Sequence, residues 1–266
     1  MRPFLPFLIL ICALSFGRAA ASKEVCTLIL DAQTGVALVA EGDCETRVTP
    51  ASTFKIPLAV MGFDAGILTG TNAPVMQFRP GDPDWGGANW TRDTDPAAWM
   101  RFSVLWYSQR ITHAMGAKAL TRYARAFGYG TADFSGDPGF DNGLDRAWIA
   151  SSLLISPREQ AAFLRALVLD GLPVRPDAMR LARDIVERHE VGGWVIHGKT
   201  GTAYPRRADR SFDDARGWGW YVGWAERNDR VLVFVRLTQA TERSDASPGN
   251  LTRDAFLQDW PELADR

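Results

Sequence analysis

The chain has 266 residues, of which 46% are hydrophobic and 23% charged, and its formal net charge is −1 at pH 7. This length and apolar content suit one large domain with a substantial core. Nucleic-acid binding is excluded by the near-balanced charge and the lack of a basic patch, so a small polar solute is the better match.

The first 21 residues are typical of a secretory signal peptide. Arg2 supplies the positive start, an apolar run covers residues 4–16, and Ala19-Ala20-Ala21 offers a cleavage site. The run is too short for a stable membrane anchor. We therefore predict a signal peptide over residues 1–21, export to the periplasm, and a single catalytic domain over residues 22–266.

The first elements of the mature chain are two expected strands, Val25–Leu30 and Val36–Ala40, joined by a turn at Gln33-Thr34-Gly35. Removal of the leader leaves two cysteines, Cys26 and Cys44. An even number of cysteines in an exported chain favours one disulfide. The hairpin supports this pairing, because it brings Cys26 near the end of the second strand.

A helix is expected to begin at Ala51 or Ser52, since Pro50 keeps the residue before it extended, and to end near Gly66. Positions i and i+3 share one helix face, so the Ser52 hydroxyl and the Lys55 amine lie one turn apart. The first turn also offers unpaired N–H groups that can stabilise an oxyanion. Together these groups predict an activated serine nucleophile.

Residues 51–190 are predicted to form a mainly helical subdomain. Turn-rich loops are expected at residues 69–94 and 133–142. Trp85 and Trp90 in the first loop either cover a groove or cap the core. Capping and proline signals predict four further helices: from Asp95-Pro96 through Ser103 and Leu105 to Gln109, from Ala117 to Phe127, after the Ser156–Glu159 capping box, and from Pro176 to about Arg188.

Strand patterns return in the last third of the chain, at Trp194–Ala203, Trp218–Trp224 and Val231–Leu237, and a helix follows at about residues 251–260. With the first hairpin they form a five-stranded antiparallel sheet built from about residues 22–50 and 191–266. We therefore predict an α+β fold, in which N- and C-terminal helices pack on this sheet beside the helical subdomain.

Lysine usage singles out a second motif, Lys199-Thr200-Gly201. The chain has four lysines among 30 basic residues, so arginine supplies most of its positive charge. Arginine cannot lose its proton in a protein, whereas a buried lysine can. A Ser-x-x-Lys pattern alone occurs about once by chance in a chain of this length. Followed by Lys-Thr-Gly, it is the signature of serine β-lactamases and penicillin-binding proteins.

Three more motifs lie between these two: Ser103-Val104-Leu105, Tyr129-Gly130-Thr131, and the segment from Trp148 to Gln160. Taken in order with residues 50–57, they make the chain resemble the class D (oxacillin-hydrolysing) serine β-lactamases over nearly the whole mature sequence. The chain departs from the family pattern at Leu105, which replaces the valine of Ser-x-Val, and at Thr131, which replaces the asparagine of Tyr-Gly-Asn.

The resemblance implies a catalytic apparatus. Ser52 would attack the lactam carbonyl and become acylated. Lys55 would be carbamylated by carbon dioxide, and this N6-carboxylysine would be the general base. Trp148 would donate its indole N–H to the carbamate, and Ser103 would pass a proton to the leaving nitrogen. No metal and no other cofactor is implied, and the three histidines show no metal-binding spacing.

The resemblance also implies a substrate site for small β-lactams. Lys199 and Thr200 would hold the substrate carboxylate, together with Arg253. The backbone N–H groups of Ser52 and Thr202 would form the oxyanion hole. The remaining members of the implied substrate site are Gly201, Leu105 and Tyr129.

Physical chemistry supports the role of Lys55 independently. A solvated lysine is protonated at neutral pH and is a poor base, so it needs an apolar environment to lower its pKa. Phe54, Leu105 and Trp148 are the candidates for that environment. The tryptophan also suits a buried anion, because its side chain is only a donor.

Three alternatives share part of the pattern. A class A β-lactamase is disfavoured, because its Ser-Asp-Asn motif is missing and Ser244-Asp245-Ala246 comes after Lys199. A penicillin-binding peptidase and a non-hydrolysing β-lactam receptor share the Ser-x-x-Lys and Lys-Thr-Gly motifs. Repeated hydrolysis of a β-lactam distinguishes a β-lactamase from both. The sequence leaves the oligomeric state and the range of β-lactams open.

Overall fold

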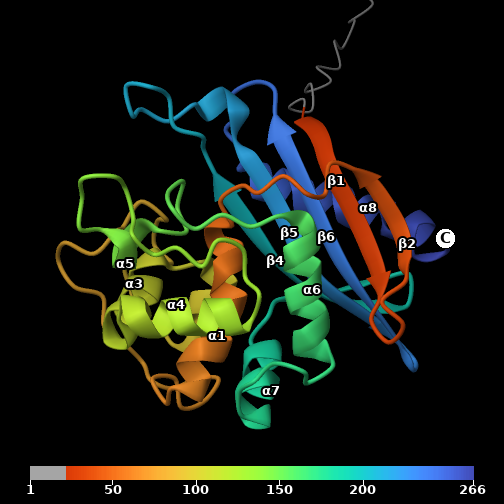
Figure 1. Ribbon diagram of the computed structural model, residues 1–266, viewed down its shortest axis with the longest axis horizontal. Coiled ribbons are helices and arrows are strands. Elements are labelled where there is room, and N and C mark those ends of the chain that lie inside the picture. Colours follow the sequence, from red (N-terminus) through yellow and green to blue (C-terminus); the bar gives the residue numbers. More distant parts are fainter. Residues whose placement is uncertain (1–21) are drawn as a thin grey trace, which may run out of the picture.

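The computed structural model describes residues 22–266, and the predicted signal peptide lies outside the described residues. A strongly twisted antiparallel sheet forms one half of the molecule, and most of the helices gather beside it (Figure 1). Within residues 22–266, no helix is both long and apolar enough to cross a bilayer.

The sheet has six strands in the order β2-β1-β6-β5-β4-β3, so the prediction of five was wrong. They are β1 (Ser22–Asp31), β2 (Ala37–Gly42), β3 (Arg188–Val191), β4 (Trp194–Ala203), β5 (Trp218–Arg227) and β6 (Arg230–Ala240). The missed strand is β3, a short edge strand that pairs with β4. Its alternately exposed and half-exposed residues offer no apolar run, which is how sheets protect their edges. The preceding helix correspondingly ends at Asp184, not near Arg188.

Side chains of the central strands alternate between the two faces of the sheet. On β5, Trp220 and Val222 belong to the large core that includes α6 (Pro157–Val168). Tyr221 lies on the opposite face, in a smaller aromatic cluster with α8 (Pro248–Ala264). The two helices therefore cover opposite faces (Figure 1). The prediction of an N-terminal helix on the sheet was wrong for the described chain, which begins with β1 and uses α6 in that position.

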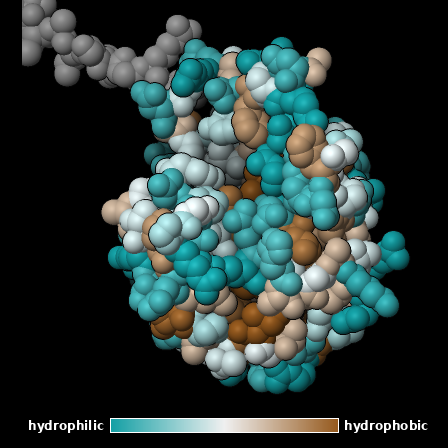
Figure 2. Space-filling view, turned by 90° about the vertical axis from the view of Figure 1, so that its left-hand side faces the viewer, coloured by the Kyte–Doolittle hydropathy of each residue, from teal (hydrophilic) through white to brown (hydrophobic). Residues whose placement is uncertain are grey.

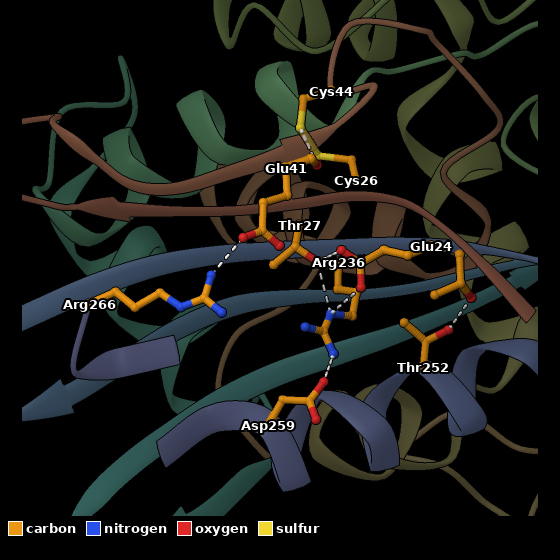
Figure 3. Close-up of polar contacts among 10 residues, drawn as sticks. Glu24, Cys26, Thr27, Glu41, Cys44, Arg236, Thr252, Asp259 and Arg266 are labelled. Atoms are coloured by element: carbon orange, nitrogen blue, oxygen red, sulfur yellow. Dashed lines mark hydrogen bonds and ion pairs between the residues drawn. A yellow bond between two sulfur atoms is a disulfide. The ribbon is translucent and has the colours of Figure 1, made fainter. Parts of the chain in front are cut away.

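Polar contacts fasten α8 to the sheet (Figure 3). Arg236 of β6 is buried, and its Nη1 donates to Asp259 Oδ2 at 2.5 Å, while its Nε donates to Thr27 Oγ1 at 3.0 Å. Nearer the start of the helix, the hydroxyl oxygens of Thr238 and Thr252 lie 2.7 Å apart. These contacts fix the helix that carries Arg253.

The predicted disulfide between Cys26 and Cys44 is confirmed. Cys26 lies on β1 opposite Gly42, the last residue of β2, so the hairpin brings the two cysteines together. The bond, drawn in yellow in Figure 3, ties the segment that follows β2 back to β1.

The helical half is built from a 3₁₀ turn (Ala51–Phe54) and the helices α1 (Lys55–Asp64), α2 (Pro96–Phe102), α3 (Leu105–Met115), α4 (Ala117–Ala126), α5 (Gly143–Arg146) and α7 (Pro176–Asp184). The predicted caps at Asp95 and Ser156 are confirmed by their side-chain hydrogen bonds to the first helical turn. The expectation of one helix from Asp95 to Gln109 was wrong. Ser103 has a left-handed conformation, with a φ of 58°, and this ends α2 before α3 begins.

Candidate active site

Ser52 lies in a 3₁₀ turn, and Lys55 is the first residue of the α-helix that continues it. Side chains at i and i+3 eclipse one another in a 3₁₀ helix, which brings them closer than α-helical geometry does. Lys55 Nζ accordingly lies 3.4 Å from Ser52 Oγ, which confirms the predicted proximity. The serine is half-buried at the surface of a cleft, and the lysine is 1% exposed beneath it.

The Lys55 amine is buried without a charged partner. No carboxylate of residues 22–266 forms an ion pair with it. Burial lowers the pKa of the Lys55 amine well below its usual value of 10.5, and the positive charge of Lys199 lowers it further. Phe54 and Trp148 belong to the same core, and their rings stack with centroids 5.4 Å apart. A neutral amine beside a serine hydroxyl is a base placed to activate a nucleophile.

Lys199 approaches from the sheet. It lies on β4, is 4% exposed, and its Nζ donates to the carbonyl of Thr200 at 3.2 Å. Burial lowers the pKa of Lys199 to about 8, an effect that Glu187 opposes and Arg253 assists. Much of the Lys199 population therefore carries a positive charge at neutral pH, which suits an anionic ligand.

Gly201 explains how β4 comes so close to the serine. A Cβ atom at this position would lie 2.9 Å from the carbonyl oxygen of Pro50 and 3.0 Å from Thr53 Cγ2. Only glycine therefore lets the strand pack directly against the turn that carries Ser52. Gly201 acts from behind the site, through this packing.

A cleft of about 860 Å³ lies between the sheet and the helical half. Its walls bring together most of the residues singled out in the sequence: Ser52, Ser103, Leu105, Trp148, Lys199, Thr200, Thr202 and Arg253. Viewed from the side of the helical half, the molecular surface is mostly hydrophilic and is hollowed below its upper lobe, where hydrophobic atoms are exposed (Figure 2). The site thus combines an apolar floor with positive charge on its walls.

Tyr129 lies elsewhere, and the prediction that it contacts substrate is corrected. It is fully buried, packs its ring edge-on against Phe163, and donates from its hydroxyl to Gln160 Oε1 at 3.3 Å. Gln160 Nε2 in turn donates to Thr53 Oγ1 at 2.7 Å. The tyrosine therefore supports the turn that carries Ser52 from within the core.

Thr131 replaces the expected asparagine without loss of hydrogen bonding. Its hydroxyl donates to the carbonyl of Ser152 at 3.1 Å and accepts the backbone N–H of Leu154 at 3.0 Å. A single hydroxyl thus supplies both a donor and an acceptor. The contact joins the Tyr129–Thr131 segment to the one that follows Trp148.

Backbone strain gathers at the cleft. Three residues other than glycine that line it have a positive φ: Ala51 at 51°, Ser103 at 58° and Ala150 at 49°. Ser103 Oγ is buried and has no hydrogen-bond partner. Strained backbone and unused polar atoms are typical of sites where a ligand completes the interactions.

Several residues of the cleft were not identified from the sequence, among them Glu187, Arg101, Arg146 and Phe212. Glu187 is the one acidic side chain among the cleft-lining residues, and it lies between α7 and β3, where no sequence signal marks it. Both loop tryptophans line the cleft, but Trp85 is 74% exposed, whereas Trp90 is 5% exposed and also belongs to the core.

Residues 22–266 contain no group of three or more His, Cys, Asp or Glu side chains that is placed to hold a metal ion. His189 and His197 occupy neighbouring register positions on the paired strands β3 and β4, and because side chains alternate along a strand they point to opposite faces of the sheet. His113 pairs with Asp145 at 2.8 Å, and His197 stacks on Trp224.

Comparison with known proteins identifies the family of this fold and site. Residues 25–257 match the penicillin-binding-protein transpeptidase domain. β-Lactamase OXA-9 of Klebsiella pneumoniae is 41% identical over 248 residues, which cover 91% of this chain and 90% of that one. β-Lactamase OXA-1 of Escherichia coli is 36% identical over 80% and 75% of the two chains. The crystal structure of the class D β-lactamase OXA-427 superposes with a TM-score of 0.83 at 42% identity, over 90% of this chain and 98% of that one. The chain therefore belongs to the class D β-lactamase family.

Proposed function

We propose that this protein hydrolyses β-lactam antibiotics through an acyl-enzyme formed on Ser52. One observation carries the proposal: the hydroxyl of Ser52 lies 3.4 Å from a buried amine whose pKa is strongly lowered. The names of the similar proteins support the same reaction. Ser52 Oγ loses its proton to the base at Lys55, bonds to the lactam carbonyl carbon, and the C–N bond of the ring then breaks.

Lys55 suits carbamylation as the source of that base. Only a neutral amine adds to carbon dioxide, and burial favours the neutral form. In the addition Nζ bonds to the carbon of carbon dioxide and loses a proton, which leaves an anionic carbamate. When present, that group supplies a general base for acylation and for the water that deacylates Ser52. Trp148, which is buried and lines the cleft, is the candidate donor to it.

The remaining roles follow from charge and position. Lys199 and Arg253 supply positive charge to the cleft, and with Thr200 they would hold the substrate carboxylate. Ser103 Oγ has an unused hydrogen-bonding capacity with which to pass a proton to the leaving nitrogen. Backbone N–H groups of Ser52 and Thr202 would stabilise the oxyanion.

We also propose that the protein acts in the periplasm after cleavage of residues 1–21. The disulfide between Cys26 and Cys44 supports this location, because such bonds persist in oxidising compartments.

A second candidate function is a β-lactam receptor that is acylated and does not turn over. The fold allows it, since the C-terminal domain of the BlaR penicillin-receptor of Bacillus licheniformis superposes with a TM-score of 0.76 at 23% identity. Both candidates need the Ser52–Lys55 pair for acylation, so turnover is the property that separates them.

Hydrolysis of nitrocefin by the mature protein tests both proposals. We expect many equivalents of nitrocefin to be cleaved per protein, a rise in rate on addition of bicarbonate, and no turnover by Ser52→Ala. Ser244→Ala is the matched control and should behave like wild type. Cleavage that stops at one equivalent would favour the receptor, and a rate indifferent to bicarbonate in carbon-dioxide-depleted buffer would exclude the carbamate.

A further inference from the structure

A cluster of two arginines, one aspartate and one phenylalanine lies at the edge of the cleft. Asp137 and Arg146 come from the helical half, where Arg146 ends α5. Arg206 and Phe212 come from the connection between β4 and β5. Arg146 and Phe212 line the cleft, whereas Asp137 and Arg206 do not. The cluster therefore joins the two halves of the molecule and presents two of its members to a ligand.

The charges in this cluster do not balance. Asp137 is buried, and its Oδ2 lies 3.3 Å from Arg206 Nη2 and 3.4 Å from Arg146 Nε. The same oxygen accepts a hydrogen bond from Asn142 Nδ2 at 3.1 Å. One carboxylate is shared by two guanidinium groups, so the cluster carries an excess positive charge.

Arg146 also has donors to spare. Its Nε and Nη2 are buried and make no hydrogen bond, because Asp137 is held beyond good hydrogen-bonding geometry. A guanidinium group offers five N–H donors in a planar fork that matches a carboxylate. The side chain lines the cleft and is 31% exposed, so the exposed part of the guanidinium group can meet a second anion while Nε stays beside Asp137.

Phe212 adds an aromatic surface to the same place. Its ring is 39% exposed, and the guanidinium carbon atoms of Arg206 and Arg146 lie 4.8 Å and 6.0 Å from the ring centroid. The two arginines thus hold the ring while part of it stays open. An aryl group with a neighbouring carboxylate matches this combination of surface and charge.

The other cations of the cleft lie on the sheet side. Lys199 is on β4 and Arg253 on α8. A penicillin carries its ring carboxylate and its acylamino side chain at opposite ends of the bicyclic nucleus, with the lactam carbonyl between them. A penicillin that is held by its ring carboxylate at Lys199 and Arg253 and attacked by Ser52 then extends its side chain towards the helical half.

We propose that Arg146 and Phe212 form a second anion subsite, which selects penicillins whose aryl acyl side chain bears its own carboxylate. The inference rests on the proposed β-lactamase function, because that function sets the orientation of the substrate over Ser52. It makes Arg146 a specificity-determining residue for dianionic substrates.

Carbenicillin and benzylpenicillin test this subsite, because they differ only by the carboxylate on the carbon that bears the phenyl ring. We expect Arg146→Gln to lower kcat/KM for carbenicillin about fivefold more than for benzylpenicillin, as for the loss of one partly exposed ion pair. Arg146→Lys keeps the charge and should retain most of the preference. Added salt should reduce the carbenicillin-to-benzylpenicillin ratio of the wild type and leave that of Arg146→Gln unchanged.

Arg206→Gln is the matched control, because it removes the other arginine of Asp137 without removing a cleft residue. It should lower the carbenicillin-to-benzylpenicillin ratio less than Arg146→Gln does, because it removes the excess charge of the cluster but keeps the guanidinium group that lines the cleft. An equal effect of Arg146→Gln on the two substrates would overturn the subsite, as would a selective loss in Arg206→Gln alone.

Dissociation constants measured in the Ser52→Ala background separate this inference from the proposed function. The ratio of the dissociation constants for carbenicillin and benzylpenicillin can be measured without turnover. Adding Arg146→Gln to Ser52→Ala should shift this ratio by the same factor that is expected for kcat/KM. Absence of hydrolysis with a retained binding ratio would overturn the function and keep the subsite. Hydrolysis of both penicillins, with a ratio of dissociation constants that Arg146→Gln does not change, would overturn the subsite and keep the proposed function.

Discussion

The two faces of the sheet bury positive charge in opposite ways. On the face covered by α8, the guanidinium of Arg236 is 4% exposed and is paired with Asp259 and hydrogen-bonded to Thr27. On the other side of the sheet, Lys55 and Lys199 are just as buried, yet no carboxylate of residues 22–266 forms an ion pair with either amine.

This difference separates a structural cation from a chemical one. A buried charge costs several kcal/mol unless it is paired, and a lysine avoids that cost by releasing its proton. Arginine cannot do so, which is why Arg236 needs Asp259. The amines of Lys55 and Lys199 remain available because no carboxylate of residues 22–266 forms an ion pair with them. Leaving these two amines unpaired lowers the stability of the fold, and it is also what makes Lys55 a base and Lys199 an anion site.

Replacement of Lys55 by methionine should have the largest effect on activity and should distinguish most clearly between the two faces of the sheet. We expect kcat/KM to fall at least about 1000-fold, since the residue is the base of the proposed mechanism. Stability should rise by about 1 kcal/mol, because a side chain of similar shape fills the site without an unpaired amine. Nitrocefin kinetics and thermal unfolding measure the two quantities on one sample.

Lys118→Met is the control, because Lys118 is exposed on α4 and should affect neither quantity. If Lys55→Met were less stable than the wild type, the amine would be a stabilising partner in the core, and the contrast with Arg236 would be lost.

The opposite result is expected on the face covered by α8. Asp259→Asn leaves the buried Arg236 with only the more distant carboxylate of Glu24, whose Oε2 lies 3.8 Å from Arg236 Nε. Stability should therefore fall by about 2 kcal/mol, less than for a fully buried pair because Asp259 is 54% exposed. Activity at 25 °C should stay within about twofold of the wild type, since neither residue lines the cleft. Denaturant unfolding measures the loss.

The double variant Asp259→Leu with Arg236→Met should recover most of this stability, as replacement of an ion pair by apolar residues often does. An Asp259→Asn protein as stable as the wild type would mean that Glu24, Thr27 and the ring contact with Phe256 are enough to hold Arg236.

The sequence predicted the parts of this molecule that depend on local chemistry. The i, i+3 relation placed Ser52 and Lys55 together, the caps at Asp95 and Ser156 located two helices, and the cysteine count predicted the disulfide. Each of these depends on residues close in the chain or on a fixed spacing.

What the sequence did not predict depends on tertiary context. The left-handed Ser103 is a helix break without glycine or proline, and the surrounding fold must enforce it. The edge strand β3 is defined only by its pairing with β4. Arg146, at the end of α5, and Phe212, between β4 and β5, come from segments that Asp137 links through its ion pairs with Arg146 and Arg206, and no motif marks Asp137. A pattern names residue types, whereas these positions are set by long-range contacts.

The pH dependence of stability gives the smallest and most specific test of the contrast. The folded pKa of Lys199 is about 8, against 10.5 for an unperturbed lysine. Between pH 8 and 9.5 the unfolded chain therefore holds a proton at this residue that the folded chain has largely lost. Because the unfolded state binds more protons, the free energy of unfolding should rise with pH, and Lys199 should contribute about 1.5 kcal/mol of that rise.

Lys199→Met should remove this contribution, whereas Lys118→Met should keep the slope of the wild type. The window stops at pH 9.5 because unfolded tyrosines begin to titrate above it, and burial raises the pKa of Tyr107 and Tyr221 in the folded state, which acts in the opposite direction. Lys55 should leave a residual rise in Lys199→Met, since its own pKa is also lowered. Equal slopes in the wild type and Lys199→Met would mean that Lys199 keeps its proton when folded. Lys199 on β4 would then stay positively charged over this pH range, and Lys55 would be the one neutral amine of the pair.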